Sequence, residues 1–167
     1  MITCLLKGGL GNQLFQIFAI IAYGLDNKLP FKFIYSDTSP SCTLRYTYWN
    51  TFLKSLRFFT IKDQPDNMKN LDHGNFPFYP IPILDGKNEN ICIEGYFQSD
   101  KYFQHRKDEI FRLIQLAPQK KTCAEKYGYQ NMENTISLHF RIGDYKYFNF
   151  AHPILRPDYY INALTYI

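Results

Sequence analysis

Residues 2–35 read ITCLLKGGLGNQLFQIFAIIAYGLDNKLPFKFIY, and they give the clearest indication of the fold class. Ile2–Leu6 is a short apolar run that ends close to two glycines, which indicates a buried strand entering a turn. Apolar residues then recur at helical spacing from Leu14 to Leu25, so a helix that is buried on most sides is expected. Phe31–Tyr35 follows a proline and has the composition of a second strand. The order strand, glycine loop, helix and strand predicts a βαβ unit, and therefore a parallel sheet.

The middle of the chain gives weaker signals. Tyr48–Phe58 is a candidate helix, whereas Gln64–Pro82 is rich in Pro, Asn and Asp and is expected to be irregular. Ile91–Glu94 is a candidate strand that ends at a glycine. A helix is expected to begin near residue 99 or 100, where Ser or Asp can cap it, and to end by about Leu116.

A polar stretch over residues 118–134 predicts a boundary between two domains, 1–130 and 131–167. Beyond it, Thr135–Phe140 is expected to form a strand in a sheet separate from that of Ile2–Leu6. Pro157 and Asp158 are expected to open a final helix. Its apolar face carries Tyr160, Ile161, Leu164 and Ile167. A single strand–loop–helix unit cannot bury both its faces, so we expect these residues to pack on the first domain or on another chain.

Composition restricts the class of protein. The 167 residues are 46% hydrophobic, 18% aromatic and 20% charged, which is typical of a folded domain. The many aromatic residues suit a core, which is the commoner explanation, and they also suit a carbohydrate-binding cleft. A formal net charge of +4 is too small and too scattered to indicate binding to nucleic acid.

The cysteines and the N-terminus indicate a cytoplasmic protein without a metal. Cys4, Cys42, Cys92 and Cys123 form no C-x-x-C pair, and no His lies at metal-ligand spacing from them. Reduced thiols are therefore expected. The first residues lack the features of a signal peptide, and the apolar run Ile17–Tyr23 is too short to span a bilayer, so a soluble, cytoplasmic protein is predicted.

The first candidate site is the loop Lys7–Gln16. Glycines between a strand and a helix let a ligand approach the backbone, and the helix N-terminus offers N–H groups to an anion. Gly9 and Gly11 lie in this loop, and Asn12 adds an amide at its mouth. Spacing alone leaves two interpretations equally open: a binding loop, or a tight connection between a strand and a helix.

The second candidate site is residues 139–145, HFRIGDY. In a strand, His139 and Arg141 share one face, and the carboxyl end of such a strand is where ligands bind in open α/β sheets. Arg141 can hold a diphosphate with a bidentate fork, and Asp144 can accept from a sugar hydroxyl. The alternative is an ion pair between Arg141 and Asp144 that fixes the loop, with His139 in the core.

Taken together, the two sites resemble the α-1,2-fucosyltransferases (glycosyltransferase family 11). Residues 8–16, GGLGNQLFQ, resemble the N-terminal signature of that family, and residues 139–145 resemble its H-x-R-R-G-D-Y element. Residues 48–52 (YWNTF), 94–103 (EGYFQSDKYF), 152–155 (HPIL) and 158–160 (DYY) also look like family segments, in the same order. One departure is Ile142, which replaces the second arginine of the pair.

The resemblance implies a glycosyltransferase of two Rossmann domains (GT-B) that transfers L-fucose from GDP-fucose with inversion, without metal or cofactor. Its acceptor would be a galactoside or another glycan. Arg141 would contact the diphosphate, and Asn12 with Gly9 and Gly11 would face the sugar end. These implied roles make Arg141 and Asn12 the catalytic candidates.

Further candidates for substrate binding are Gly9, Gly11, His139, Gly143 and Asp144. No catalytic base is assigned. Family members are longer, so the domain 131–167 is expected to be an incomplete donor-binding domain that a partner chain would complete. The alternative function is a truncated remnant without activity, or half of a split enzyme, that binds a glycan or a partner.

Overall fold

The structure is a computed structural model, and it describes residues 1–39, 44–74, 77–84, 89–128, 135–147, 149–150 and 152–166. It forms two compact units, Met1–Lys126 and Tyr127–Ile167, and each is described by itself. The assignment of these units to an acceptor-side and a donor-side domain stays a prediction. No helix in the described ranges is long and apolar enough to cross a membrane.

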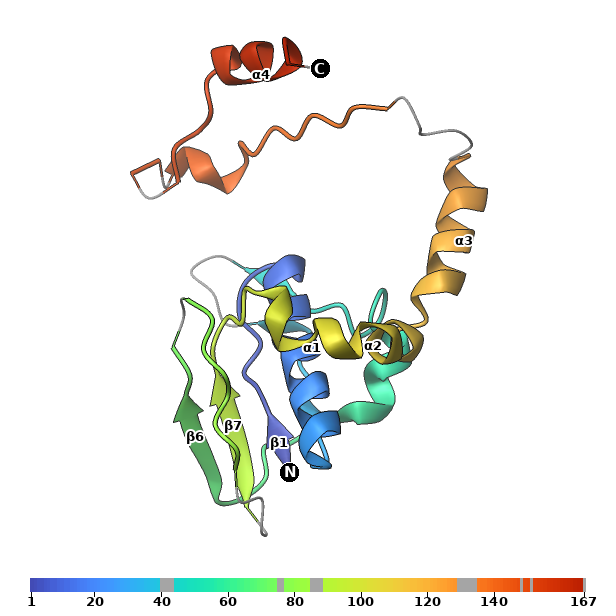
Figure 1. Cartoon of the computed structure of the whole chain (residues 1–167), viewed down its shortest axis with the longest axis vertical. Helices are drawn as coiled ribbons and strands as arrows, with labels where there is room; N and C mark the ends of the chain where they lie inside the picture. The colour runs from blue at the N-terminus through green and yellow to red at the C-terminus, as the bar shows by residue number, and fades with distance from the viewer. Residues whose placement is uncertain are drawn as a thin grey trace. The chain divides into compact units, whose positions relative to one another are not determined.

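A three-stranded parallel sheet forms the centre of the first unit. Its strands are β1 (Ile2–Thr3), β7 (Asn90–Glu94) and β6 (Met68–Asp72), in the order β1-β7-β6. Ile2 pairs with Ile91 in β7, and all the pairings are parallel. The three strands lie side by side in Figure 1, with α1 beside them. The prediction of an α/β fold with a parallel sheet is therefore confirmed.

Further strands extend this arrangement. Phe31 makes a parallel bridge to Ile2, and β2 (Phe33–Ile34) then pairs in parallel with β5 (Thr60–Ile61). The predicted βαβ unit is thus present, although β1 and β2 are shorter than expected. A small antiparallel pair joins β3 and β4, whose bounds are Thr38–Ser39 and Arg45–Tyr46.

The helix α1 (Leu10–Asn27) is the main element of the core. Its residues from Ile17 to Gly24 are all buried, as the nearly continuous apolar sequence predicts. The helix ends at Lys28, which adopts a left-handed conformation, and the N–H of Leu29 returns to the carbonyl of Gly24. A Cβ at Gly24 would lie 2.7 Å from the ring of Phe31, so the absence of a side chain allows α1 to approach the following segment.

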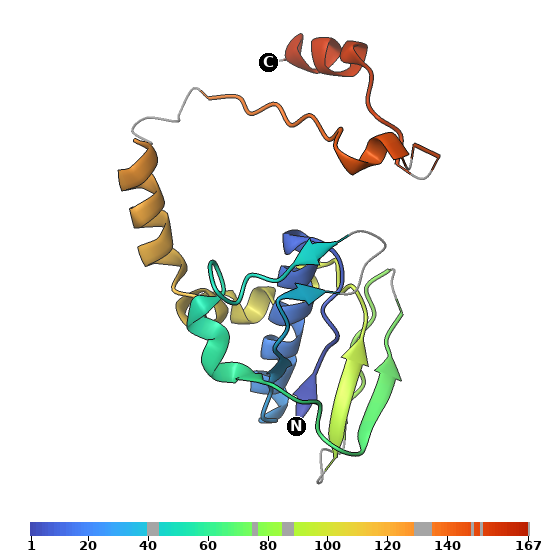
Figure 2. The same cartoon turned by 180° about the vertical axis from the view of Figure 1, so that it is seen from behind.

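The core packs α1 between the parallel strands, the segment 49–56 and α2 (Lys107–Leu113). Figure 2 shows the segment after β2 in front of α1 when the unit is seen from behind. The largest fully buried side chains are Trp49, Phe33, Ile2, Ile17, Ile20, Ile21, Leu53, Leu56, Ile93, Ile110, Ile114 and Gln13. Gln13 is the polar exception among them, and it belongs to the glycine loop described below.

The region predicted to be irregular contains a strand. β6 (Met68–Asp72) lies inside Gln64–Pro82 and pairs over five residues with β7. Two consecutive residues of this strand, Lys69 and Asn70, are exposed, since β6 lies at the edge of the sheet. An edge strand needs no alternating apolar pattern, which explains why the prediction was wrong here. The candidate helix Tyr48–Phe58 is a 3₁₀ helix, η1, over Lys54–Phe59.

The single helix expected from residue 99 to 116 is divided into three pieces, and a fourth helix follows it. The pieces are η2 (Asp100–Tyr102), η3 (Gln104–Arg106) and α2 (Lys107–Leu113), and the helix that follows is α3 (Leu116–Tyr127). Ser99 caps the first of them by accepting from the N–H of Lys101.

Helix α3 occupies the region that the sequence assigned to a polar boundary. Gln115 has φ 53°, a left-handed conformation that separates α2 from α3. Pro118 lies in the first turn of α3, where a missing N–H costs no helical hydrogen bond, so proline does not end the helix there. The amide of Gln119 donates to the carbonyls of Phe52 and Ile114, which fixes the start of α3 on the first unit.

In the second unit, the predicted strand Thr135–Phe140 is not formed. Residues 135–142 have no regular secondary structure, because the described part of this unit offers no neighbouring strand to pair with them. A short 3₁₀ helix, η4 (Asp144–Tyr147), follows. The final helix is confirmed as α4 (Pro157–Leu164), with the proline at its start.

The apolar side chains of the second unit are largely exposed. Ile161 and Leu164 are 59% and 43% exposed, and Phe140 is 55% exposed. The ring of Tyr160 packs locally on the ring of Phe140, with 4.5 Å between the ring centres. Ile167 lies outside the described residues. The expectation that these residues are covered by the first domain or by another chain stays a prediction.

Candidate functional site

The glycine loop connects β1 to α1. Gly8 has φ +79°, a left-handed conformation that favours glycine, and it turns the chain away from the strand. Gly9 is the N-cap of α1 with an extended backbone, and its carbonyl accepts from the N–H of Gln13. A Cβ added at Gly9 or Gly11 would meet no atom within 4 Å. The backbone of the loop is therefore open to a ligand at these two glycines.

Two buried glutamines hold the loop from beneath. The side chain of Gln16 accepts from the N–H of Lys7 at 2.8 Å and donates to its carbonyl at 3.2 Å. The side chain of Gln13 donates to the carbonyls of Gly8 and Tyr46, both at 2.9 Å. The loop is thus rigidly connected to α1 and β4, as a pre-formed binding site requires.

Other loops meet the glycine loop at the carboxyl edge of the sheet. Gln98, in the loop after β7, donates from Nε2 to Oδ1 of Asn12 at 2.7 Å. Lys7 Nζ lies 2.9 Å from a carboxylate oxygen of Glu94, the last residue of β7. Ligands in open α/β sheets bind at this edge, because the loops after parallel strands gather there.

Lys7 and Glu94 form a partly buried ion pair at this edge. The hydrogen bond to Glu94 is the main reason why the pKa of Lys7 is raised above its ordinary value. Deeper in the sheet, burial raises the pKa of the Cys92 thiol to about 11 and that of Cys4 well above its usual range. Both are free, buried thiols, in agreement with the expectation of reduced cysteines, whereas Cys42 lies outside the described residues.

A second group of side chains at this edge was missed by the sequence analysis. Nε2 of His73 lies 2.9 Å from the carbonyl oxygen of Tyr79 and 3.2 Å from the hydroxyl of Tyr102. The His73 ring stacks on Phe97 at 5.5 Å. Phe97 is buried and has φ +50°, an uncommon conformation for an aromatic residue. The aromatic residues of the segment 94–103 could have indicated such a cluster. The contact of Phe97 with His73, however, depends on the strand β6, which was not predicted.

The second candidate site lies in the second unit. The Arg141 guanidinium lies over the Tyr145 ring, 4.6 Å from its centre, and Tyr145 stacks on His152. The carbonyl of His139 accepts from the hydroxyl of Tyr160 at 3.3 Å. The side chains of His139 and Arg141 are exposed, as a ligand would need.

Gly143 and Asp144, two further candidates, follow Arg141 in this unit. Gly143 has open space where a Cβ would lie. Asp144 begins η4, and its side chain lies outside the described part. The structure therefore brings Gly9, Gly11 and Asn12 together in one unit, and Arg141 with its neighbours in the other. The functional roles of all seven residues stay predictions.

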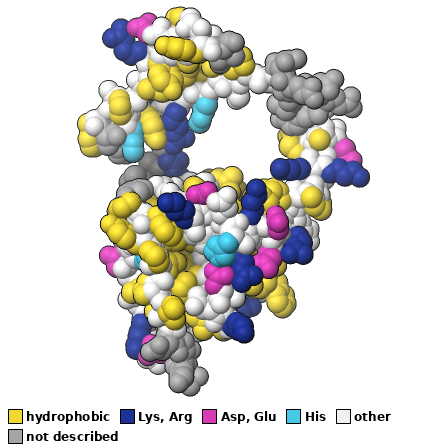
Figure 3. All heavy atoms as spheres, in the orientation of Figure 1, with side chains coloured by type: hydrophobic (Ala, Val, Ile, Leu, Met, Phe, Trp, Pro, Cys, Tyr) yellow, Lys and Arg dark blue, Asp and Glu magenta, His cyan; other side chains and the backbone are white. Residues whose placement is uncertain are grey.

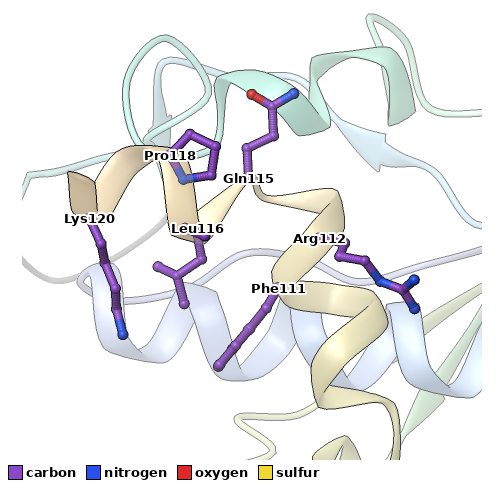
Figure 4. Close-up of a pocket in the computed structure, with 7 residues that line it drawn as sticks. Phe111, Arg112, Gln115, Leu116, Pro118 and Lys120 are labelled. Carbon is purple, nitrogen blue, oxygen red and sulfur yellow. The ribbon is translucent and has the colours of Figure 1, made fainter. Parts of the chain in front are cut away.

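Surface cavities among the described residues also lie away from the glycine loop. One of about 380 Å³ lies between α2 and the start of α3 and is lined mainly by apolar groups, including Phe111, Leu116 and Pro118, as Figure 4 shows. Cavities of about 470 and 220 Å³ lie beside Phe52 and Tyr23. Basic and acidic side chains are mixed over the face of the first unit seen in Figure 3. Within the described ranges, no group of three or more His, Cys, Asp or Glu could hold a metal ion.

A parallel α/β layer with a glycine loop at its carboxyl edge is typical of the open α/β folds that bind ligands at this edge. The chain is distantly similar to "Galactoside 2-alpha-L-fucosyltransferase" of Caenorhabditis elegans, with 29% identity over 157 residues. It is also similar to "O-antigen biosynthesis glycosyltransferase WbnK" of Escherichia coli, with 28% identity over 207 aligned positions. The predicted resemblance to fucosyltransferases is thus confirmed as a distant similarity.

The chain is shorter than both relatives. The alignment covers 88% of the chain but 39% of the nematode protein, and 100% of the chain but 68% of the bacterial one. No family model matches the chain, and no solved structure gives a significant match.

Proposed function

We propose that this chain is the acceptor-side domain and part of the donor-side domain of an inverting glycosyltransferase. The reaction moves L-fucose from GDP-fucose to a sugar hydroxyl, the 2-hydroxyl of galactose. The observation that carries the proposal is the similarity to a galactoside 2-alpha-L-fucosyltransferase over 88% of the chain. The open glycine loop at the carboxyl edge of the sheet supports it, since this is the edge at which such folds bind ligands.

Each candidate residue has a role in this reaction. The acceptor oxygen bonds to the anomeric carbon of fucose while the bond from that carbon to the β-phosphate oxygen breaks. GDP leaves with the electron pair, and Arg141 stabilises the charge that develops on it. Asn12 donates to an oxygen of the donor, and the bare backbone at Gly9 and Gly11 admits the ligand.

The remaining substrate-binding candidates lie near Arg141. Gly143 leaves room beside the loop, and His139 and Asp144 offer polar groups to the nucleotide sugar. The acceptor proton leaves to a base that we do not assign.

A second candidate function is binding of a glycan or of a partner chain without catalysis. The exposed apolar residues of the second unit favour it, because soluble proteins rarely expose several such side chains together. Light scattering at several concentrations tests whether a partner covers them: association that rises with concentration is expected, and a stable monomer contradicts a covering copy.

The enzyme assay measures release of GDP from GDP-fucose by the full chain with a panel of galactosides and other glycans. We expect GDP release that requires a galactoside and persists in EDTA, with a fucosylated product visible by mass spectrometry. Arg141→Ala is expected to abolish it. Equal turnover with GDP-mannose, or none with any acceptor while GDP still binds, would contradict the proposed transfer.

A further inference from the structure

The amide of Asn12 is held on two sides. Its Oδ1 accepts from Nε2 of Gln98 at 2.7 Å, a contact that joins residues 86 positions apart in the sequence. Its Nδ2 lies 2.5 Å from the point where a Cβ of Gly8 would be, so it occupies the space that the missing side chain leaves. The left-handed turn at Gly8 and the loop after β7 therefore determine the position of this one amide.

The place of Gln98 is itself fixed by a buried neighbour. Phe97 precedes it with φ +50°, and non-glycine residues in this region are held there by their surroundings. The Phe97 ring stacks on His73 and meets Tyr102 edge-on at 5.3 Å. The carbonyl of Phe97 accepts from the N–H of Ser99 at 2.7 Å. This packing turns the backbone so that the exposed side chain of Gln98 reaches the glycine loop.

An amide that accepts through its oxygen directs its N–H₂ group the opposite way. With Gln98 donating to Oδ1, Asn12 presents hydrogen-bond donors over Gly8, beside the open backbone at Gly9 and Gly11. Donors suit the phosphate and hydroxyl oxygens of a nucleotide sugar, whereas an exposed amide oxygen would repel them.

We propose that Gln98 is a positioning residue for Asn12: it sets the orientation of the amide so that the glycine loop offers a hydrogen-bond donor to an oxygen of the sugar-nucleotide donor. The identity of that ligand rests on the proposed function, whereas the orientation of the amide does not. The packing of Phe97 between His73 and Tyr102 then serves the site through Gln98.

The orientation is tested directly by NMR on the labelled full chain. We expect NOEs from the Asn12 side-chain amide protons to the Gly8 α-protons, and we expect them to weaken in Gln98→Met, in which the donor is lost. NOEs from the Asn12 amide protons to the Gln98 side chain, with none to Gly8, would overturn the proposal. This measurement needs no ligand.

The binding arm compares GDP and GDP-fucose by calorimetry on the wild type, Gln98→Met, Asn12→Asp and the control Gln104→Met, which changes an exposed glutamine on η3. A lost hydrogen bond to an anionic ligand predicts about tenfold weaker binding for Gln98→Met and a larger loss for Asn12→Asp, whose carboxylate still accepts from Gln98 but cannot donate. Gln104→Met is expected to bind like the wild type.

The two ligands show which oxygen is recognised. A loss with both GDP and GDP-fucose assigns the contact to phosphate, and a loss with GDP-fucose alone assigns it to the sugar. Wild-type affinity for both ligands in Gln98→Met overturns the positioning role. If the wild type binds neither ligand, the proposed function is wrong in its nucleotide-sugar donor. The NOE pattern then still shows whether Gln98 sets the orientation of the Asn12 amide.

Discussion

Gly8→Ala is expected to destabilise the first unit by about 2–3 kcal/mol, the sum of a backbone effect and a contact effect. Gly8 has φ +79°, and an alanine in the left-handed region costs about 1–2 kcal/mol. The added Cβ would lie 2.5 Å from Nδ2 of Asn12, so that side chain must move and its bond with Gln98, worth about 1 kcal/mol, is lost.

Gly74 provides a matched control for the backbone effect alone. It has φ +77°, almost the same conformation, but a Cβ there meets no atom within 4 Å. Gly74→Ala is therefore expected to cost about 1–2 kcal/mol, which is less than Gly8→Ala by the contribution of the Asn12 contact.

Two further variants separate stability from ligand binding. Gly9 is an N-cap with φ −78°, and serine is a better N-cap than glycine, so Gly9→Ser is expected to keep or slightly raise stability. Gly11 lies in the first turn of α1, where Gly11→Ala is expected to stabilise by about 0.5–1 kcal/mol. Both add atoms to the open face of the loop, so both are expected to weaken binding of GDP-fucose.

The assay is urea unfolding followed by fluorescence of Trp49, the single tryptophan of the chain. Trp49 is fully buried and lies 5.6 Å from the Phe33 ring, so its emission reports the first unit. Equal destabilisation by Gly8→Ala and Gly74→Ala would refute the role of the Asn12 contact. Unchanged ligand binding in Gly9→Ser and Gly11→Ala would refute the assignment of the loop as a binding site.

Three shorter predictions concern other groups. Arg141→Ala is expected to weaken GDP binding at least about tenfold in calorimetry and His139→Ala less, because only a guanidinium grips two phosphate oxygens; equal losses contradict this. The pKa of Lys7 is raised in the folded chain by its ion pair with Glu94. The pair therefore stabilises the fold fully at pH values below the unfolded pKa of about 10.4, and this stabilisation is lost as pH rises through the folded pKa. Unfolding at alkaline pH should therefore be less pH-dependent in Lys7→Met than in the exposed control Lys69→Met, and identical curves would argue against it. Iodoacetamide is expected to modify the exposed Cys123 in the native chain and the two buried thiols after unfolding, as mass spectrometry of tryptic peptides can check; early modification of the buried thiols would show that the sheet opens.

The regular elements that could be predicted are those in which apolar residues are concentrated. Helix α1 and strand β7 are nearly continuous apolar runs, and the core uses almost every one of their apolar residues. Strand β6 gave no such signal, because an edge strand is held by its neighbour's backbone. The break between α2 and α3 depends on the left-handed conformation of Gln115, a residue type that carries no turn signal.

The candidate site was predictable only as far as local sequence determines it. The glycine loop lies within a few residues of one strand and one helix, so its position followed from their order. The bond between Gln98 and Asn12 joins loops 86 residues apart, and the His73 cluster requires β6 to be in place. Such contacts depend on the register of the sheet, which single-sequence patterns do not contain.

Residues 135–142 separate two properties that a strand normally combines. Alternation places Ile136, Leu138 and Phe140 on one side of an extended chain and His139 and Arg141 on the other, but only pairing with a neighbour keeps the chain extended. The segment has this alternation without regular structure, and those three apolar residues are 52%, 45% and 55% exposed. A neighbouring strand that paired with this segment would bury the three apolar side chains, and it would also fix the distance between His139 and Arg141. The proposed phosphate binding by Arg141 is therefore expected to be coupled to formation of the strand. Whatever stabilises the strand would also pre-organise the guanidinium, and without it the ligand would have to supply the free energy of ordering.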